Sequence, residues 1–251
     1  MTFDVAADAY DRFMGRYSQP LAPQLADFAG VESGMRALDV GCGPGALTTE
    51  LVARLGAESV ASADPSAPFA NAARERHPGV EVVLAQAEDL PFADDAFDAT
   101  LAQLVVPFMT DPLAGLAEMK RVTRAGGVVA ACVWNHPGRS PLGQFWRAAR
   151  QRDPSAHSEA NQAGTREGHL AELFREVGIR DVEDSVLDVS VELASFDDYW
   201  QPVTLGVGPA GAYLADLDAD AIADLRERCH ASLGDGPLVV TAHAWTARGR
   251  V

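Results

Sequence analysis

The sequence predicts an α/β protein with a mostly parallel, Rossmann-like sheet and helices on both of its faces. A short apolar strand at residues 37–40 leads through a glycine-rich loop into a helix that carries Leu47, Leu51 and Leu55 on one face. Segments with the periodicity of strands and of helices then alternate as far as residue 134. Such alternation is typical of parallel sheets, because each crossover helix returns the chain to the starting edge.

Local start and stop signals place the other elements. Asp111 is expected to cap a helix that begins at Pro112. Gly178 is expected to end the helix over residues 170–177. Apolar runs and helical spacing predict further strands over residues 59–63, 80–84, 99–104, 128–134, 182–191 and 238–245, and helices over residues 3–17, 20–28, 142–151 and 170–177. A helical insertion is expected over residues 195–236, with a capping box at Ser195 and Asp198.

Composition limits the class of protein and of partner. A chain of 251 residues with 47% hydrophobic residues suits a single domain, here expected to span residues 1–251. The net charge of −16 argues against binding to nucleic acid, whose phosphates call for basic patches. The three cysteines are widely separated, as expected of buried thiols in a reducing compartment. With no leader and no long apolar run, we expect a cytoplasmic protein that does not enter a membrane.

The glycine loop predicts a cofactor site. Asp39 lies in the first strand, and Gly41, Cys42, Gly43 and Gly45 follow. Glycines between a strand and a helix N-terminus let the backbone approach a nucleoside-containing ligand. With Ala46 and an acid about 20 residues on, the same glycines also satisfy the dinucleotide fingerprint. On the glycines alone, a nicotinamide enzyme and a turn that binds nothing stay open.

Asp64 is the acid in question, at the end of the second strand. The Asp64–Pro65 pair is expected to open a helix, with the aspartate as its N-cap. A carboxylate at this place is also suited to accept hydrogen bonds from both ribose hydroxyls of a nucleoside cofactor. The two roles are compatible, so we include both residues in the predicted cofactor site.

The sequence resembles the class I S-adenosylmethionine-dependent methyltransferases across residues 36–135. RALDVGCGPGALTTE (36–50) is similar to their motif I, and AEDLPF (87–92) is similar to the adenine-binding region of the type 11 methyltransferases. The resemblance implies S-adenosylmethionine as cofactor, S-adenosylhomocysteine as product, and adenine contacts at Gln86, Ala87 and Glu88. Gln86 stands where the family usually has Asp, and its carbonyl can still accept a hydrogen bond.

The same resemblance implies a seven-stranded sheet with an antiparallel last strand. It also implies that Gln103 lies against the cofactor. YDRFMGRY (10–17) is similar to the N-terminal segment of small-molecule methyltransferases. Residues 1–30 are therefore interpreted as helices that form a lid, with Tyr10 and Met14 over the cofactor. A first helix that is only docked on the domain stays open as the alternative. Residues 195–236 are interpreted as a helical cap inserted between the last two strands.

The predicted function is methyl transfer to a small-molecule acceptor by in-line displacement. The [N/D]-P-P-[Y/F] string of enzymes that methylate base amines is absent, and no Y-x-x-x-K pair or other feature favours a nicotinamide enzyme. A regulatory module that binds the cofactor without transfer is the main alternative. No metal-ligand cluster and no oligomeric state are indicated. The expected substrate contacts are aromatic, at Tyr17, Trp134, Phe145, Trp146, Tyr199 and Trp200, and the candidate general bases are His136 and His157.

Overall fold

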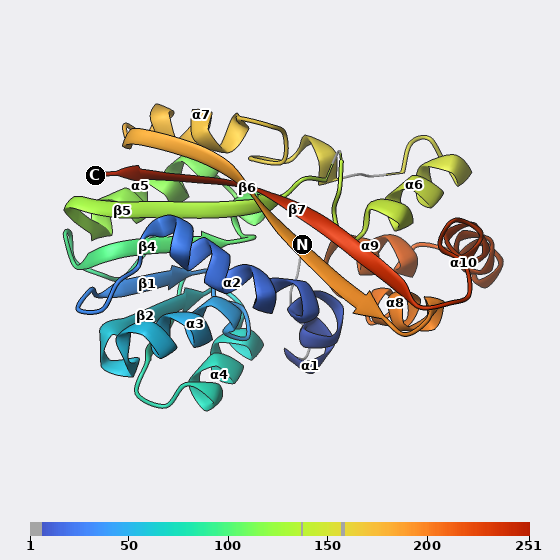
Figure 1. Ribbon diagram of the computed structural model, residues 1–251, viewed down its shortest axis with the longest axis horizontal. Coiled ribbons are helices and arrows are strands. Elements are labelled where there is room, and N and C mark those ends of the chain that lie inside the picture. The colour runs from blue at the N-terminus through green and yellow to red at the C-terminus, as the bar shows by residue number, and fades with distance from the viewer. Residues whose placement is uncertain (1–6, 137, 157–158) are drawn as a thin grey trace.

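The computed structural model describes residues 7–136, 138–156 and 159–251. Its sheet has the strand order β3-β2-β1-β4-β5-β7-β6 (Figure 1). Neighbours among β1 to β5 pair in parallel, whereas β7 is antiparallel to both β5 and β6. The predicted Rossmann-like sheet with a reversed last strand is confirmed. The strands are β1 Ala37–Val40, β2 Val60–Asp64, β3 Glu81–Leu84, β4 Phe97–Gln103, β5 Thr123–Trp134, β6 Arg180–Leu193 and β7 Leu238–Arg250.

Helices lie on both faces of this sheet (Figure 1). Helices α2 and α3 pack with one face, while α5 and α7 pack with the other. The helices are α1 Ala7–Tyr10, α2 Arg16–Ala29, α3 Ala46–Leu55, α4 Ala67–Arg76, α5 Pro112–Val122, α6 Gly143–Arg152, α7 His169–Glu176, α8 Phe196–Val203, α9 Gly208–Ala215 and α10 Ala219–Leu233.

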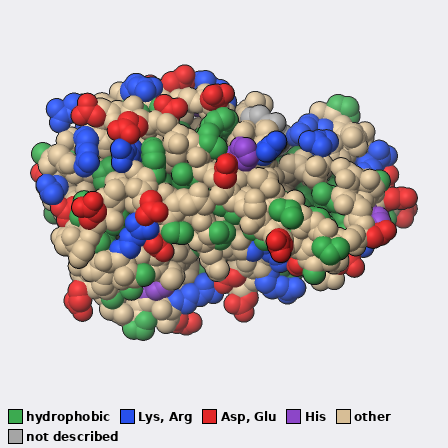
Figure 2. Space-filling model, in the orientation of Figure 1, with side chains coloured by type: hydrophobic (Ala, Val, Ile, Leu, Met, Phe, Trp, Pro, Cys, Tyr) green, Lys and Arg blue, Asp and Glu red, His purple; other side chains and the backbone are tan. Residues whose placement is uncertain are grey.

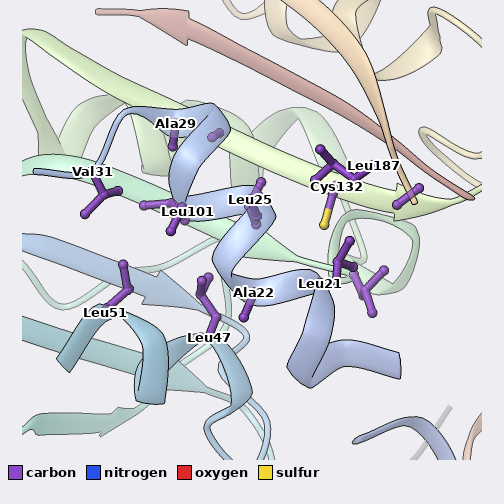
Figure 3. Packing of buried hydrophobic residues seen from close by; sticks show 14 of the residues in the cluster. Leu21, Ala22, Leu25, Ala29, Val31, Leu47, Leu51, Leu101, Cys132 and Leu187 are labelled. Carbon is purple, nitrogen blue, oxygen red and sulfur yellow. The ribbon is translucent and has the colours of Figure 1, made fainter. Parts of the chain in front are cut away.

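Helix α2 is fixed to the sheet by its apolar side. Leu21, Leu25 and Ala29 recur at helical spacing and are almost fully buried. Figure 3 shows them beside Leu101 of β4 and Cys132 of β5. Burying a leucine side chain contributes about 1.5–3 kcal/mol, so this contact holds the N-terminal segment firmly over the central strands.

The N-terminal helix is longer than predicted. In place of two helices, α1 continues through a π-helical turn at Asp11–Gly15 into α2, which contains Pro20 and Pro23. Each proline removes one N–H donor from the helix and crowds the carbonyl four residues before it, at a cost of about 3 kcal/mol, and the burial of the apolar side offsets that cost. Single π-helical turns within α-helices are frequent at functional sites. This one lies where the helix reaches the carboxyl edge of the sheet.

Strands β6 and β7 run beyond the other strands into a second group of helices (Figure 1). Helices α8, α9 and α10 lie between these two strands in the chain and pack with α6. The predicted helical insertion is therefore present, and Ser195 accepts a hydrogen bond from the Asp198 N–H at its start. The core of this group is rich in aromatic side chains.

Charged side chains of both signs are interspersed on the face seen in Figure 2. Among the described residues, ion pairs include Arg248 with Glu183 at 2.9 Å and Arg54 with Asp27 at 2.7 Å. Exposed pairs of this kind contribute little to stability, about 0–1 kcal/mol each. Among the described residues, no helix is both long and apolar enough to span a bilayer.

Candidate active site

The glycine loop is held against the neighbouring strands at the carboxyl edge of the sheet. The Gly41 N–H donates to the Ala63 carbonyl of β2 at 2.7 Å. Gly41 has a φ of +69°, and a Cβ there would lie 2.5 Å from Cγ2 of Val105, which follows β4. Gly43 also has a positive φ, +53°, but nothing described lies within 4 Å of a Cβ placed on it. Gly41 thus allows the loop backbone to pack closely against Val105, whereas Gly43 borders space that no described atom fills.

Asp64 connects the second strand to this loop. Its Oδ2 accepts a hydrogen bond from the Gly43 N–H at 2.8 Å, and its Oδ1 accepts one from the Ser66 N–H at 2.8 Å. The predicted N-cap role is wrong, because α4 begins at Ala67 and its N-cap is Ser66, which accepts from the Phe69 N–H. A carboxylate has about four lone-pair sites, so each oxygen of Asp64 can accept one more hydrogen bond. Burial raises the pKa of Asp64.

A smaller cavity, of about 340 Å³, lies between the glycine loop and α2. Asp39 and Gln103 line it, as do Gly41, Cys42 and Gly45. Oδ1 of Asp39 and Oε1 of Gln103 are buried and have no hydrogen-bond partner among the described residues. Such atoms are costly unless a ligand or water satisfies them. Two acceptors and a glycine wall suit the ammonium group of an amino-acid-like ligand.

Asp39 is kept in place by Thr48, whose hydroxyl donates to Oδ2 at 2.7 Å. The side chain is 1% exposed. Burial raises the pKa of Asp39 to about 7, against the opposing effect of the Thr48 hydrogen bond. A cationic ligand group next to Oδ1 would favour the carboxylate and reverse this shift.

A larger cavity, of about 720 Å³, extends along the carboxyl edge. Asp64 and Gln86 line one part of it, and Trp134 and His136 line another. Strands β2 and β5 are separated by β1 and β4, which corresponds to three strand spacings or roughly 14 Å. Ligand sites in proteins typically measure about 300–1,000 Å³. The cavity is therefore long enough for two small ligands placed end to end.

The residues predicted for adenine lie at the β3 end of this cavity. Gln86, Ala87 and Glu88 all line it, as does Pro65, which was predicted to lie in the cofactor site beside Asp64. Oε1 of Glu88 accepts hydrogen bonds from the backbone N–H groups of Thr110 and Asp111, so this carboxylate also organises the loop before α5.

Comparison with known proteins identifies the family. Residues 38–131 match the family model for a methyltransferase domain. A demethylmenaquinone methyltransferase from Renibacterium salmoninarum is 30% identical over 172 residues, which cover 63% of this chain and 72% of that protein. The chain belongs to the class I S-adenosylmethionine-dependent methyltransferases.

Two further similarities are more limited. A malonyl-[acyl-carrier protein] O-methyltransferase from Pectobacterium atrosepticum is 32% identical over 145 residues, 58% of this chain and 56% of that one. The fold of this methyltransferase is similar to that of phosphoethanolamine N-methyltransferase 2 from Haemonchus contortus, which was solved with S-adenosylhomocysteine. The TM-score is 0.60, and the sequences are 17% identical. The match covers 97% of this chain and 56% of that one. The second similarity shows the fold alone.

The N-terminal helix of the methyltransferase borders both cavities. Tyr10 lines each of them, and Phe13 and Met14 line the larger one. The Trp134 indole N–H donates to the Met14 sulfur at 3.3 Å, which joins the helix to the end of β5. At the other side, Arg76 of α4 donates to the Pro44 carbonyl at 3.1 Å and pairs with Asp11.

Most of the predicted substrate contacts of the methyltransferase lie elsewhere. Trp134 lines the larger cavity, but the other five aromatic residues do not. They are buried in hydrophobic cores, where they pack with one another and with neighbouring apolar side chains: Tyr17, Phe145, Trp146, Tyr199 and Trp200. Instead, the insertion contributes Gly208 and Pro209, at the beginning of α9, to the cavity wall. These five residues were predicted as substrate contacts from their aromatic character, but the structure places their side chains in hydrophobic cores.

The structure also places residues at the site that the sequence did not suggest. Phe13, Leu142 and Glu159 line the larger cavity of the methyltransferase. Glu159 follows a polar segment with no strand or helix periodicity, and only its contact with Trp146 of α6 explains its burial. His136 lines the cavity as predicted, whereas His157 lies outside the described residues.

Proposed function

We propose that this methyltransferase transfers the methyl group of S-adenosylmethionine to a small, mostly apolar acceptor bound at the β5 end of the larger cavity. The observation that carries this proposal is the continuity of that cavity, which joins Asp64 and Gln86 to Trp134 and His136. The reactive part of the cofactor and the acceptor can then lie next to each other in one continuous cavity, as an in-line displacement needs.

The cofactor fits the groups at the glycine end. Asp39 and Gln103 would receive its methionyl ammonium group, because each presents a buried acceptor atom without a partner. Asp64 would accept hydrogen bonds from the ribose hydroxyls, since its position is already fixed by Gly43 and Ser66. Gln86 and Ala87 would border the adenine at the β3 end.

The remaining lining suits an acceptor of limited size and polarity. Apolar side chains from four parts of the chain surround the β5 end: Phe13, Met14, Val133, Trp134, Leu142 and Pro209. The relative named for demethylmenaquinone supports an apolar acceptor, because its name refers to a quinone. Such a lining would exclude water from the site. The main contribution of the protein would then be to align the acceptor atom with the methyl group.

When bound, S-adenosylmethionine supplies a methyl group that its sulfonium already activates. The protein therefore has to hold the acceptor atom behind the methyl carbon, at about 3–3.5 Å, and to limit the approach of water. Trp134 and the N-terminal helix would form the walls that do so.

The direct test is to incubate the protein with methyl-labelled S-adenosylmethionine and a library of metabolites and aromatic compounds. The expected result is label in small organic products that extract from the protein. Label found only in protein or RNA would contradict the small-molecule acceptor. Binding of S-adenosylhomocysteine without any transfer would favour the alternative of a regulatory module.

A further inference from the structure

A buried histidine and a buried glutamate meet at the β5 end of the larger cavity. His136 follows β5, and Glu159 lies in the segment after α6. Both line the cavity, although their side chains are only 8% and 4% exposed. Nδ1 of His136 lies 3.7 Å from Oε2 of Glu159 and has no hydrogen-bond partner among the described residues.

Glu159 is held in place by the core beneath it. The Trp146 indole N–H donates to Oε2 at 3.0 Å. Trp146 itself is 3% exposed and packs edge-on against Phe145, with ring centroids 4.9 Å apart. Burying a carboxyl group is costly unless it is hydrogen-bonded or paired, and an apolar residue would fill this place without that cost. A purely structural role therefore does not explain why a glutamate is buried at position 159.

The electrostatics keep the His136 ring neutral, with a nitrogen lone pair free to accept a proton. Burial lowers the pKa of His136 to about 4, so its imidazole is neutral at pH 7. Burial raises the pKa of Glu159 to about 7, while the Trp146 hydrogen bond opposes that shift. The other titratable side chains that line the cavity in the described part of the chain are Tyr10, Asp64 and Glu88.

Charged groups next to this pair point elsewhere. Arg139, which follows in the same loop, lies 3.4 Å from the His243 ring of β7, and that ring lies 3.6 Å from Asp188 of β6. Among the described residues, Glu159 is therefore the one carboxylate in ion-pair distance of His136.

We propose that His136 is the general base of the transfer, that Glu159 is its positioning residue, and that the acceptor carries a hydroxyl group on an apolar body. This inference rests on the proposed function. Glu159 would hold the proton of His136 on Nδ1, which leaves Nε2 to accept the hydroxyl proton.

The proposed reaction transfers one methyl group and one proton. The acceptor oxygen forms a bond to the methyl carbon while the carbon–sulfur bond breaks, and its electron pair stays on sulfur. The hydroxyl proton passes to Nε2 of His136, and the imidazolium that results is stabilised by the Glu159 carboxylate. After product release the proton returns to solvent.

The lining favours a neutral hydroxyl over an ammonium group. A cationic acceptor would need carboxylates around it. In the part of the chain that the structure describes, Glu159 is the one carboxylate at the β5 end, and it is engaged by Trp146 and faces His136. A neutral phenol-like hydroxyl needs a single base and an apolar surround, and both are present.

The first test needs no turnover. Nitrogen NMR of the histidine rings, in protein saturated with S-adenosylhomocysteine, reports the tautomer at pH 7, and the spectrum of His136→Gln assigns the signal. A neutral ring with the proton on Nδ1 is expected. A proton on Nε2, or an imidazolium at pH 7, would overturn the proposal.

The second test measures transfer from S-adenosylmethionine to phenols and naphthols of graded acidity, with the matched anilines and naphthylamines alongside. General-base catalysis contributes roughly 10²–10⁴-fold, so His136→Gln should lower kcat for weakly acidic phenols at least a hundredfold. The loss should shrink for nitrophenols, which ionise unaided, and Glu159→Gln should cause a smaller loss of about tenfold.

Two controls separate this role from a loss of structure. The dissociation constant of S-adenosylhomocysteine should stay within about threefold in both variants, and His243→Gln should retain wild-type rates. An equal loss for all phenols, or transfer to amines alone, would overturn the inference and leave the proposed function intact. A wild-type protein that binds S-adenosylhomocysteine but methylates none of these compounds, nor any in the wider library, would contradict the proposed function. In that case the NMR measurement of the His136 tautomer still tests the role proposed for this histidine.

Discussion

The Gly43 N–H donates a 2.8 Å hydrogen bond to the carboxylate of Asp64. This contact joins the loop after β1 to the end of β2, so the position of the carboxylate is set by the glycine loop itself. A preset acceptor loses less entropy when it binds a ligand. The cofactor assignment of Asp64 therefore depends on the same loop that makes room for the cofactor.

Asp64→Ala is expected to weaken the binding of S-adenosylhomocysteine roughly tenfold to a hundredfold. A hydrogen bond to a charged group is worth about 1.5–3 kcal/mol. Calorimetric titration gives the dissociation constant, and a melting curve without ligand gives the accompanying loss of stability. Ser66→Ala is the matched control, because it removes the cap of α4, at a cost of about 1 kcal/mol, but leaves the carboxylate. An unchanged affinity in Asp64→Ala would remove this residue from the site.

The affinity for S-adenosylhomocysteine is expected to rise with pH up to about pH 7 and then to level off. Burial raises the pKa of Asp39 to about 7, and the proton on this carboxyl competes with the ligand ammonium group. Below that pKa, affinity should fall by up to about tenfold per pH unit. The slope should vanish in Asp39→Asn, which calorimetry at several pH values would show. A slope that persists in this variant would assign the titration to another group.

The stability of the ligand-free protein should change with pH in the opposite direction. The folded-state pKa of Asp39 lies above its ordinary value of 3.8. The contribution of Asp39 to the free energy of unfolding is therefore fully present below pH 3.8 and is lost as the pH rises through about 7. Comparing the denaturant midpoints of wild type and Asp39→Asn across this range isolates that contribution. A wild-type midpoint that rises more steeply than that of the variant would contradict it.

Trp200→Ala is expected to destabilise the fold rather than to remove a substrate contact. Trp200 is 5% exposed and stacks with Phe196 at a centroid distance of 6.1 Å. Truncating a buried tryptophan typically costs about 3–5 kcal/mol. Chemical denaturation measures this loss, and the KM for the acceptor in the folded fraction should stay near wild type at low temperature. A raised KM at full stability would restore Trp200 as a substrate residue. Tyr213→Phe is the control, since its hydroxyl has no partner among the described residues.

Arg76→Ala is expected to speed the dissociation of the cofactor by a few-fold. Arg76 connects Asp11 of the N-terminal helix to the Pro44 carbonyl of the glycine loop. A partly exposed pair of this kind is worth about 0.2–1 kcal/mol and is screened by salt. Stopped-flow measurements at low and high salt would reveal the effect, with Arg228→Ala on the remote helix α10 as the control. Equal rates in both variants would mean that Arg76 does not hold the helix over the site.

Local sequence signals predicted the sheet well. The strand at residues 37–40 and the cap at Asp111 depend on neighbours in the chain, and both appear at the expected places. The error at Asp64 is also local, because Asp64–Pro65 and Ser66 with Pro68 are both reasonable helix starts, and only the hydrogen bonds distinguish them.

The β5 end of the cavity depends on contacts that sequence spacing does not encode. Glu159 reaches His136 only because Trp146 of a different helix supports it. Tyr199 and Trp200 are as aromatic as expected of an acceptor cap, but the same property makes them suited to a core, and the core contains them. Long-range packing decides between these two outcomes.

The most direct measurement is calorimetric titration of the purified protein with S-adenosylhomocysteine and, separately, with NAD. One binding site for S-adenosylhomocysteine is expected, weakened by Asp64→Ala and by Asp39→Asn, with no heat from NAD. Heat from NAD and none from S-adenosylhomocysteine would contradict the assignment of the carboxyl-edge cavities to S-adenosylmethionine.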